Sequence, residues 1–163
     1  MESCCTVKPA EVSAATACPA CRRPGRTVER ITPKALLRSE ALMRLSEAPY
    51  RFCPTAACGV VYFAAESVFR REDLAVPVFQ KEPQGGRTVC YCFGIAEADV
   101  RREIAETGTS TAAERITALV KADRCACEVR NPQGTCCLGN VLAVVKAAGV
   151  QARETEQSLA SSR

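Results

Sequence analysis

The cysteines are the feature of this sequence that most constrains its fold. The chain of 163 residues contains 12 cysteines and no histidine. Ten of the cysteines form one group in each half of the chain: Cys18, Cys21, Cys53 and Cys58, then Cys90, Cys92, Cys125, Cys127, Cys136 and Cys137. Thiolate sulfur selects zinc, copper(I) and iron–sulfur clusters. Because imidazole is absent, we expect two metal centres that are held largely by sulfur.

The composition favours a small metal-stabilised protein over a secreted disulfide scaffold. Aromatic residues make up only 5% of the chain, so two cores would each be small and metal binding would supply part of the folding energy. The first 20 residues lack the pattern of a signal peptide, and CxxC and CxC spacings suit metals better than disulfides. We therefore expect a cytoplasmic location.

The charge pattern argues against two classes of partner. The net charge of +4 is mild, and Arg and Lys are interspersed with Glu and Asp, so we expect no binding to nucleic acid. No segment is long and apolar enough to span a bilayer, so we expect no membrane insertion.

The first cysteine group predicts a structural zinc site. Cys18 and Cys21 form a CxxC pair, and Cys53 and Cys58 form a CxxxxC pair. Zinc takes four tetrahedral ligands, and four thiolates leave no open position for catalysis. The alternative is a set of reduced, buried cysteines. A thioredoxin-like redox pair is disfavoured, because no βαβ pattern surrounds the CxxC sequence.

The hydrophobic pattern predicts an α+β protein. We expect strands near 27–31, 50–52 and 60–63, one or two short helices between 33 and 46, and a linker or loop near 77–87. In the second half we expect helices at 97–106, from the Thr111–Glu114 capping box, and from Cys137 to Ala148, the last stopped by Gly149. The predicted order is a flexible tail (1–16), a small β-rich zinc-binding subdomain (17–87), a helical [2Fe–2S]-binding subdomain (88–150) and a second flexible tail (151–163).

The second cysteine group predicts a [2Fe–2S] cluster. In an extended segment, Cys90 and Cys92 leave the same face and can bind one iron. The other pair must come from Cys125, Cys127, Cys136 and Cys137, and Cys137 lies at the expected start of the last helix, where the helix dipole stabilises negative charge. Four thiolates on two irons is the usual ligation of this cluster.

These motifs carry a resemblance to a known family. The segments Cys90–Gly94 and Cys125–Val141 resemble the N-terminal domain of the CopZ copper chaperone family, which contains a [2Fe–2S] fold similar to bacterioferritin-associated ferredoxin. The CPAC sequence and the Cys53–Cys58 pair resemble the zinc-binding part of that family. By position, the resemblance implies that Cys90, Cys92, Cys127 and Cys137 are the cluster ligands. Cys125 and Cys136 would then be extra thiols, as structural bystanders, as alternative ligands or as part of a transfer site. With Cys4 and Cys5 they are candidates to bind a labile soft metal such as Cu⁺.

Three functions follow as hypotheses. The resemblance implies a metal-handling redox protein, whose cluster delivers one electron, for example from Cu(II) to Cu(I). The family's best-known member continues into a copper-binding domain with an MxCxxC-type loop, which is missing here, so onward transfer would need a protein partner. The alternatives are a ferredoxin-like electron carrier or redox sensor, and a zinc-stabilised binding module with a merely structural cluster. We expect no enzyme, because without His a Cys–His or Ser–His pair is impossible, and carboxylates such as Glu103 and Glu106 read as solvated.

Overall fold

A four-stranded antiparallel sheet forms the first half of the fold. The computed structural model describes residues 16–161. The sheet has the order β1-β2-β3-β4, with β1 (Arg26–Val28), β2 (Tyr50–Phe52), β3 (Val60–Phe63) and β4 (Val68–Arg70). All four residues of β3 are buried, as expected for a central strand of β-branched and aromatic residues. The strands predicted at 50–52 and 60–63 are confirmed, and β4 was not predicted.

Two short helices, α1 (Ile31–Leu36) and α2 (Ser39–Leu42), connect β1 to β2, as the sequence predicts. Helix α1 begins two residues before Pro33, so this proline lies in the first turn, where a missing N–H costs no helical hydrogen bond. Leu37, Ala41, Tyr50, Phe52 and other side chains of this half share one hydrophobic core.

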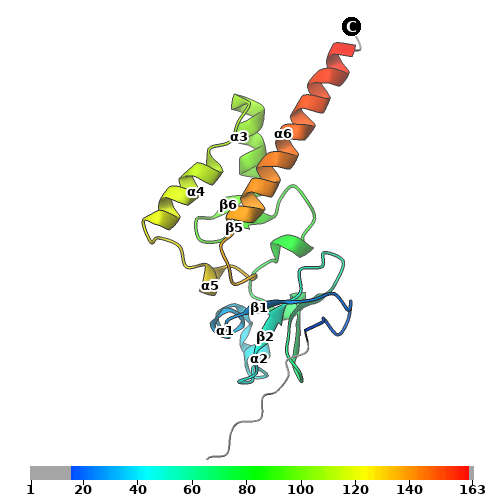
Figure 1. Ribbon diagram of the computed structural model, residues 1–163, viewed down its shortest axis with the longest axis vertical. Coiled ribbons are helices and arrows are strands. Elements are labelled where there is room, and N and C mark those ends of the chain that lie inside the picture. The colour runs from blue at the N-terminus through cyan, green and yellow to red at the C-terminus, as the bar shows by residue number, and fades with distance from the viewer. Residues whose placement is uncertain (1–15, 162–163) are drawn as a thin grey trace, which may run out of the picture.

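The second half is mostly helical (Figure 1). A hairpin of β5 (Thr88–Cys90) and β6 (Ile95–Ala96) leads into α3 (Glu97–Thr107), α4 (Ala112–Lys121), α5 (Cys127–Arg130) and α6 (Leu138–Ser161). Helix α3 ends as predicted at Gly108, whose φ of 82° is the left-handed conformation that favours glycine after a helix. The hairpin and α5 were not predicted, because each is too short to give a periodic pattern.

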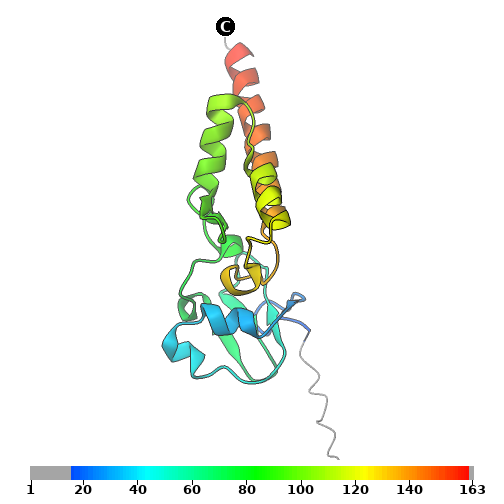
Figure 2. The ribbon, with the colours of Figure 1, turned by 90° about the vertical axis from the view of Figure 1, so that its left-hand side faces the viewer.

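Helix α6 is longer than the sequence predicts. It continues through Gly149 to Ser161, so the predicted end at Ala148 is wrong, and the stretch expected to be a tail from residue 151 is helical to that point. Gly149 has no positive φ, and good helix formers such as Ala152 and Gln157 follow it. The end of α6 extends beyond α3 in both views (Figure 2). Within residues 16–161, no helix has the length and apolar character needed to cross a membrane.

The start of α4 is capped differently from the predicted capping box. The Thr111 hydroxyl and backbone N–H both donate to Glu103, and the Ser110 hydroxyl donates to the other oxygen of this carboxylate. The Ser110 hydroxyl accepts the N–H of Ala112 at 3.2 Å. These contacts, led by the one from Ser110, lower the pKa of Glu103 to about 2. Glu103 is therefore not a merely solvated charge, because it joins α3 to the start of α4.

The expected linker is packed between the two halves. It follows a short 3-10 helix, η1 (Arg71–Asp73), and contains a second one, η2 (Phe79–Lys81). Phe79 belongs to the second hydrophobic core, together with Val89, Val100, Ile116, Val141 and others. Tyr91 of the β5–β6 turn donates to the carbonyl of Pro77 at 2.7 Å. The two cores are thus joined by an ordered segment.

Glu97, the first residue of α3, is the centre of a buried ion network. Its side chain is fully buried and lies 2.7 Å from Arg87 and 2.6 Å from Arg101, whose side chains are 16% and 28% exposed. Burial opposes ionisation of this carboxyl, but hydrogen bonds from the Gly85 N–H, Arg101 and Arg87 outweigh burial and lower its pKa. The network holds the segment before β5 against the start of α3.

Replacing Glu97→Gln should lower the free energy of unfolding by about 3 kcal/mol at pH 7, because it breaks a buried ion pair. This value is the lower end of the usual cost, since both arginines are partly exposed. The folded pKa lies below the unfolded value of about 4.3, so the contribution is complete above that pH and is lost as the pH falls below it. Urea unfolding of both proteins at several pH values measures this.

The exposed Glu106→Gln variant is the control, and it should differ little from the unmodified protein at any pH. A Glu97→Gln difference that is absent at pH 7, or that grows on acidification, would contradict the assignment.

Candidate metal centres

The CxxC pair lies in a tight turn before β1. The N–H of Cys18 donates to the Arg23 carbonyl at 2.8 Å, and the N–H of Arg22 donates to the Cys18 carbonyl at 2.9 Å. Arg22 has a φ of 61°, and Ala17 pairs with Pro24 where the turn closes. This local hydrogen bonding brings the sulfurs of Cys18 and Cys21 toward the same point.

The second pair flanks the connection between two neighbouring strands. Cys53 directly follows β2, and its N–H donates to the Val61 carbonyl of β3 at 2.9 Å. Cys58 precedes β3, and its N–H donates to the Thr55 carbonyl at 3.1 Å, which closes the loop on itself. The antiparallel pairing of β2 and β3 therefore sets the separation of this pair.

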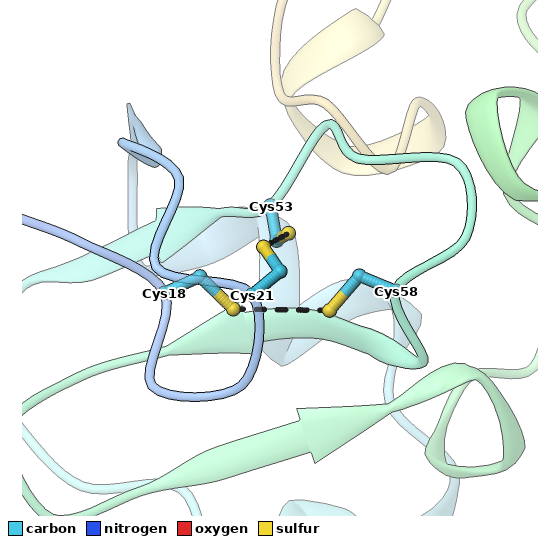
Figure 3. Close-up of side chains that lie close together, drawn as sticks. All are labelled: Cys18, Cys21, Cys53 and Cys58. Carbon is cyan, nitrogen blue, oxygen red and sulfur yellow. Dashed lines mark hydrogen bonds between the residues drawn. The ribbon is translucent and has the colours of Figure 1, made fainter.

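The four sulfurs converge beside the sheet (Figure 3). All four Sγ atoms lie within 4.8 Å of one another, with 3.9 Å between Cys18 and Cys58 and 3.6 Å between Cys21 and Cys53. Sulfurs at 2.3 Å from one tetrahedral zinc are about 3.8 Å apart, so the arrangement fits this ion. In the described part of the chain, no other group of three or more Cys, Asp or Glu residues converges in this way.

The surroundings of the quartet affect the acidity of its thiols. The Thr55 hydroxyl lies 3.4 Å from Cys21 Sγ, and this contact is the main reason that the pKa of Cys21 falls to about 6. Burial raises the pKa of Cys53 to about 12 and also raises that of Cys58. Burial of these thiols as thiolates therefore requires a positive charge nearby, which a metal ion supplies.

A buried lysine also contacts this loop, and sequence reasoning missed it. Lys81 is 5% exposed, and its Nζ donates to the carbonyls of Thr55 and Cys58, both at 2.9 Å. Burial lowers the pKa of Lys81, whereas the nearby thiolates, first that of Cys53, act to raise it. Neither Lys81 nor Thr55 belongs to a sequence motif, so no signal in the sequence identifies them.

The second cysteine group is arranged as two pairs. Cys90 and Cys137 have their sulfurs 2.8 Å apart, and the sulfurs of Cys92 and Cys127 are 3.6 Å apart. Cys90 ends β5, Cys92 lies in the turn that follows, Cys127 begins α5 and Cys137 directly precedes α6. These are the four residues that the resemblance implies, but the pairing differs from the expected one. Cys92 lies in the turn after β5 and not on an extended segment, and its sulfur is close to that of Cys127, whereas the sulfur of Cys90 is close to that of Cys137.

Hydrogen bonds to these sulfurs favour thiolate at some positions. The N–H of Ala126 donates to Cys92 Sγ at 3.3 Å. The hydrogen bond from Cys137 lowers the pKa of Cys90 to about 6, against the effect of burial, and the N–H groups of Phe93 and Cys92 lower it further. The same contact raises the pKa of Cys137, and burial raises that of Cys127 to about 12. Backbone N–H groups around clustered sulfur suit an anionic centre.

The two extra thiols that the structure describes lie outside both sets. Cys136 is exposed and Cys125 is half-buried, and neither belongs to the zinc quartet or to the two close pairs. Cys4 and Cys5 lie outside the described residues.

The Cys58→Ala variant should lose bound zinc, from about one ion per chain to almost none, because three thiolates do not close a tetrahedral shell. Its thermal stability should also fall, since binding to a structural zinc site contributes to folding. Cobalt(II) added to the zinc-free unmodified protein should give the visible bands of tetrahedral thiolate coordination, and Cys58→Ala should not. Cys125→Ala is the control, and zinc lost equally in both variants would contradict the assignment.

The zinc-binding domain family of CopZ matches residues 15–75, the region of the quartet. The copper chaperone CopZ of Archaeoglobus fulgidus is 34% identical over 120 residues, covering 74% of this chain and 57% of that protein.

A solved structure matches most of this chain. The X-ray structure of the CopZ N-terminal domain of Archaeoglobus fulgidus is 30% identical and matches with a TM-score of 0.68, covering 78% of this chain and 96% of that one. The chain therefore spans little more than half of the full-length relative, but nearly all of its N-terminal domain. On this basis, the chain belongs to the family of CopZ N-terminal domains.

Proposed function

We propose that this chain is a metal-handling redox protein related to copper chaperones, with a structural zinc and a [2Fe–2S] cluster. The zinc is held by Cys18, Cys21, Cys53 and Cys58, and the cluster by Cys90, Cys92, Cys127 and Cys137. The observation that carries the proposal is that the second set lies as two close sulfur pairs, not as one quartet.

The donor set fits a two-iron centre. Each iron of such a cluster takes two thiolates, so two separate pairs are the arrangement that it needs. The sulfurs are mostly buried, since Cys90, Cys127 and Cys137 are no more than 7% exposed. Cys92, which is half-buried and accepts the N–H of Ala126, is the ligand closest to solvent by exposure.

When bound, a [2Fe–2S] cluster supplies one electron at a time. A one-electron reduction of Cu(II) at nearby thiols yields Cu(I), the ion that thiolates prefer. Cys136, directly before Cys137, is exposed, and Cys125 lies two residues before Cys127, so this chain presents two extra thiols close in sequence to the cluster ligands. With Cys4 and Cys5, these thiols are the proposed site for copper or another soft metal.

The relative supports this role, because the full-length protein is named a copper chaperone. The chain spans 57% of that protein. We also propose a protein partner for the transfer of metal or of electrons. We propose a cytoplasmic location, because the CxxC and CxC spacings suit metal binding better than disulfides. We also propose no enzymatic activity, because the chain has no histidine to pair with Ser or Cys as general base.

A second candidate is a ferredoxin-like electron carrier or redox sensor that binds a larger partner and does not transfer copper. One observation favours it: among residues 16–161, only the zinc quartet brings three or more potential ligand atoms together, so these residues contain no preformed third metal site of that size.

Anaerobic reconstitution with iron and sulfide should give a brown protein with about two irons and about one zinc per chain. Cys92→Ala and Cys127→Ala should each lose the iron and the visible absorption while retaining zinc. Cys125→Ala and Cys136→Ala are matched controls, and they should retain both metals. The opposite pattern, with iron lost from the two controls only, would contradict the ligand assignment.

Copper binding separates the two candidate functions. Copper(I) added to zinc- and cluster-loaded protein should form a stoichiometric complex that the quadruple variant Cys4→Ala, Cys5→Ala, Cys125→Ala, Cys136→Ala does not form. Copper(II) added to dithionite-reduced protein should restore the absorption of the oxidised cluster. Equal copper uptake by both proteins would contradict the proposed thiols, and no uptake with a reversible one-electron couple would establish the second candidate.

A further inference from the structure

The three residues of η2 connect the two metal-ligand sets. Phe79 lies in the same hydrophobic core as Cys90 and Cys137. Gln80 donates through Nε2 to Gln133 Oε1 at 2.6 Å, in the loop between Cys127 and Cys137. Lys81 donates to two carbonyls of the zinc loop. One short helix therefore contacts the zinc loop, the second core and the loop that carries two of the proposed cluster ligands.

The contact with the zinc loop depends on the shape of that loop. The ammonium of Lys81 donates to the carbonyls of Thr55 and Cys58 at the same time. Cys58 is itself a ligand of the second pair, and Thr55 lies between Cys53 and Cys58 in the sequence. Four thiolates around one zinc carry a net negative charge, because they outnumber the two positive charges of the ion. This charge stabilises a buried ammonium, which otherwise loses solvation at high cost. Zinc bound to Cys53 and Cys58 would hold the loop between them in the shape that presents these two carbonyls to Lys81.

The contact with the second loop fixes the residue before Cys137. Gln133 is 5% exposed and donates through Nε2 to the carbonyl of Cys136 at 3.0 Å. Its Oε1 accepts from Asn140 of α6 at 3.3 Å as well as from Gln80. Gln80 therefore orients the side chain that holds the backbone at Cys136 and the start of α6.

The same loop also rests on the sheet by contacts that do not involve η2. The Tyr62 hydroxyl donates to the Pro132 carbonyl at 2.7 Å in a buried position. Gly134 has a φ of 67°, and a Cβ there would lie 3.0 Å from Thr32 Oγ1. The first contact comes from β3 and the second from α1, and neither involves a zinc ligand, so they provide a control.

We propose that η2 couples the two cysteine sets. Zinc in the first site then stabilises the folded conformation of the loop 131–137, the conformation that the second centre needs. Gln80 and Lys81 are then positioning residues, which act through the loops that they hold. The identity of the second centre rests on the function proposed above, whereas the coupling itself does not.

Hydrogen exchange of the full-length, iron-free protein tests the coupling, because zinc can be supplied or withheld. Zinc should slow exchange of the amides from Gln133 to Cys137 by at least about fivefold, the lower end of ordinary coupling between sites. Gln80→Leu keeps the size of the side chain but removes the donor, and in this variant zinc should slow the exchange of the same amides by less than about twofold. The zinc affinity of Gln80→Leu, measured by chelator competition, should fall by no more than the factor by which the coupling is reduced.

Tyr62→Phe is the matched control. It removes a hydrogen bond to the same loop, so exchange should be faster with and without zinc, and the effect of zinc should be unchanged. An unmodified protein in which zinc does not slow exchange, or a Gln80→Leu variant that keeps the full effect of zinc, would overturn the proposal.

Two further measurements keep the test decisive. If the zinc-free protein unfolds, its α3 amides will exchange freely, and the comparison is then made between zinc-loaded proteins alone. In these, Gln80→Leu should exchange faster than the unmodified protein at both 55–58 and 133–137. Faster exchange at 133–137 only would overturn the coupling. Iron content after reconstitution is measured separately. A protein that takes up no iron contradicts the cluster, while the exchange comparison still decides the coupling.

Discussion

The convergence of four sulfurs beside the sheet is the constraint on which the first half of the fold depends. The ligands come from the turn before β1 and from both ends of the connection between β2 and β3, so one ion would fix three strands relative to one another. Three of the four cysteines are buried in a small cluster with Val60 and Phe63. Burying thiolates without a cation is costly, whereas a metal ion makes the same burial favourable.

The second half repeats this use of sulfur with a different geometry. Four of its six cysteines lie on a hairpin and at the two ends of the loop before α6, and they form two pairs. The loop that carries Cys127 also contacts the zinc-binding half through Tyr62 and Gln133. The two cysteine sets are therefore parts of one packed structure, and the segment 77–87 between them is ordered by Tyr91, Glu97 and Lys81.

The features that the sequence predicts correctly are those set by residues close together in the chain. The spacing of Cys18 and Cys21 implies a shared ion because the turn between them is local, and Val60–Phe63 is predicted as a strand because its residues favour a buried sheet. Lys81 and Glu97 could not be assigned, since their roles come from partners brought close only by folding. The end of α6 was mispredicted for the opposite reason: Gly149 is a common stop signal, but the residues after it continue the helix.

X-ray absorption at the zinc and iron edges of anaerobically reconstituted protein reports the atoms bound to each metal, and it therefore tests whether each cysteine set binds its proposed centre. We expect zinc surrounded by four sulfurs at about 2.3 Å, with no metal neighbour. We expect iron surrounded by sulfur, with a second iron close by. Zinc ligated by oxygen or nitrogen, or both cysteine sets occupied by the same isolated metal, would contradict the two proposed metal centres.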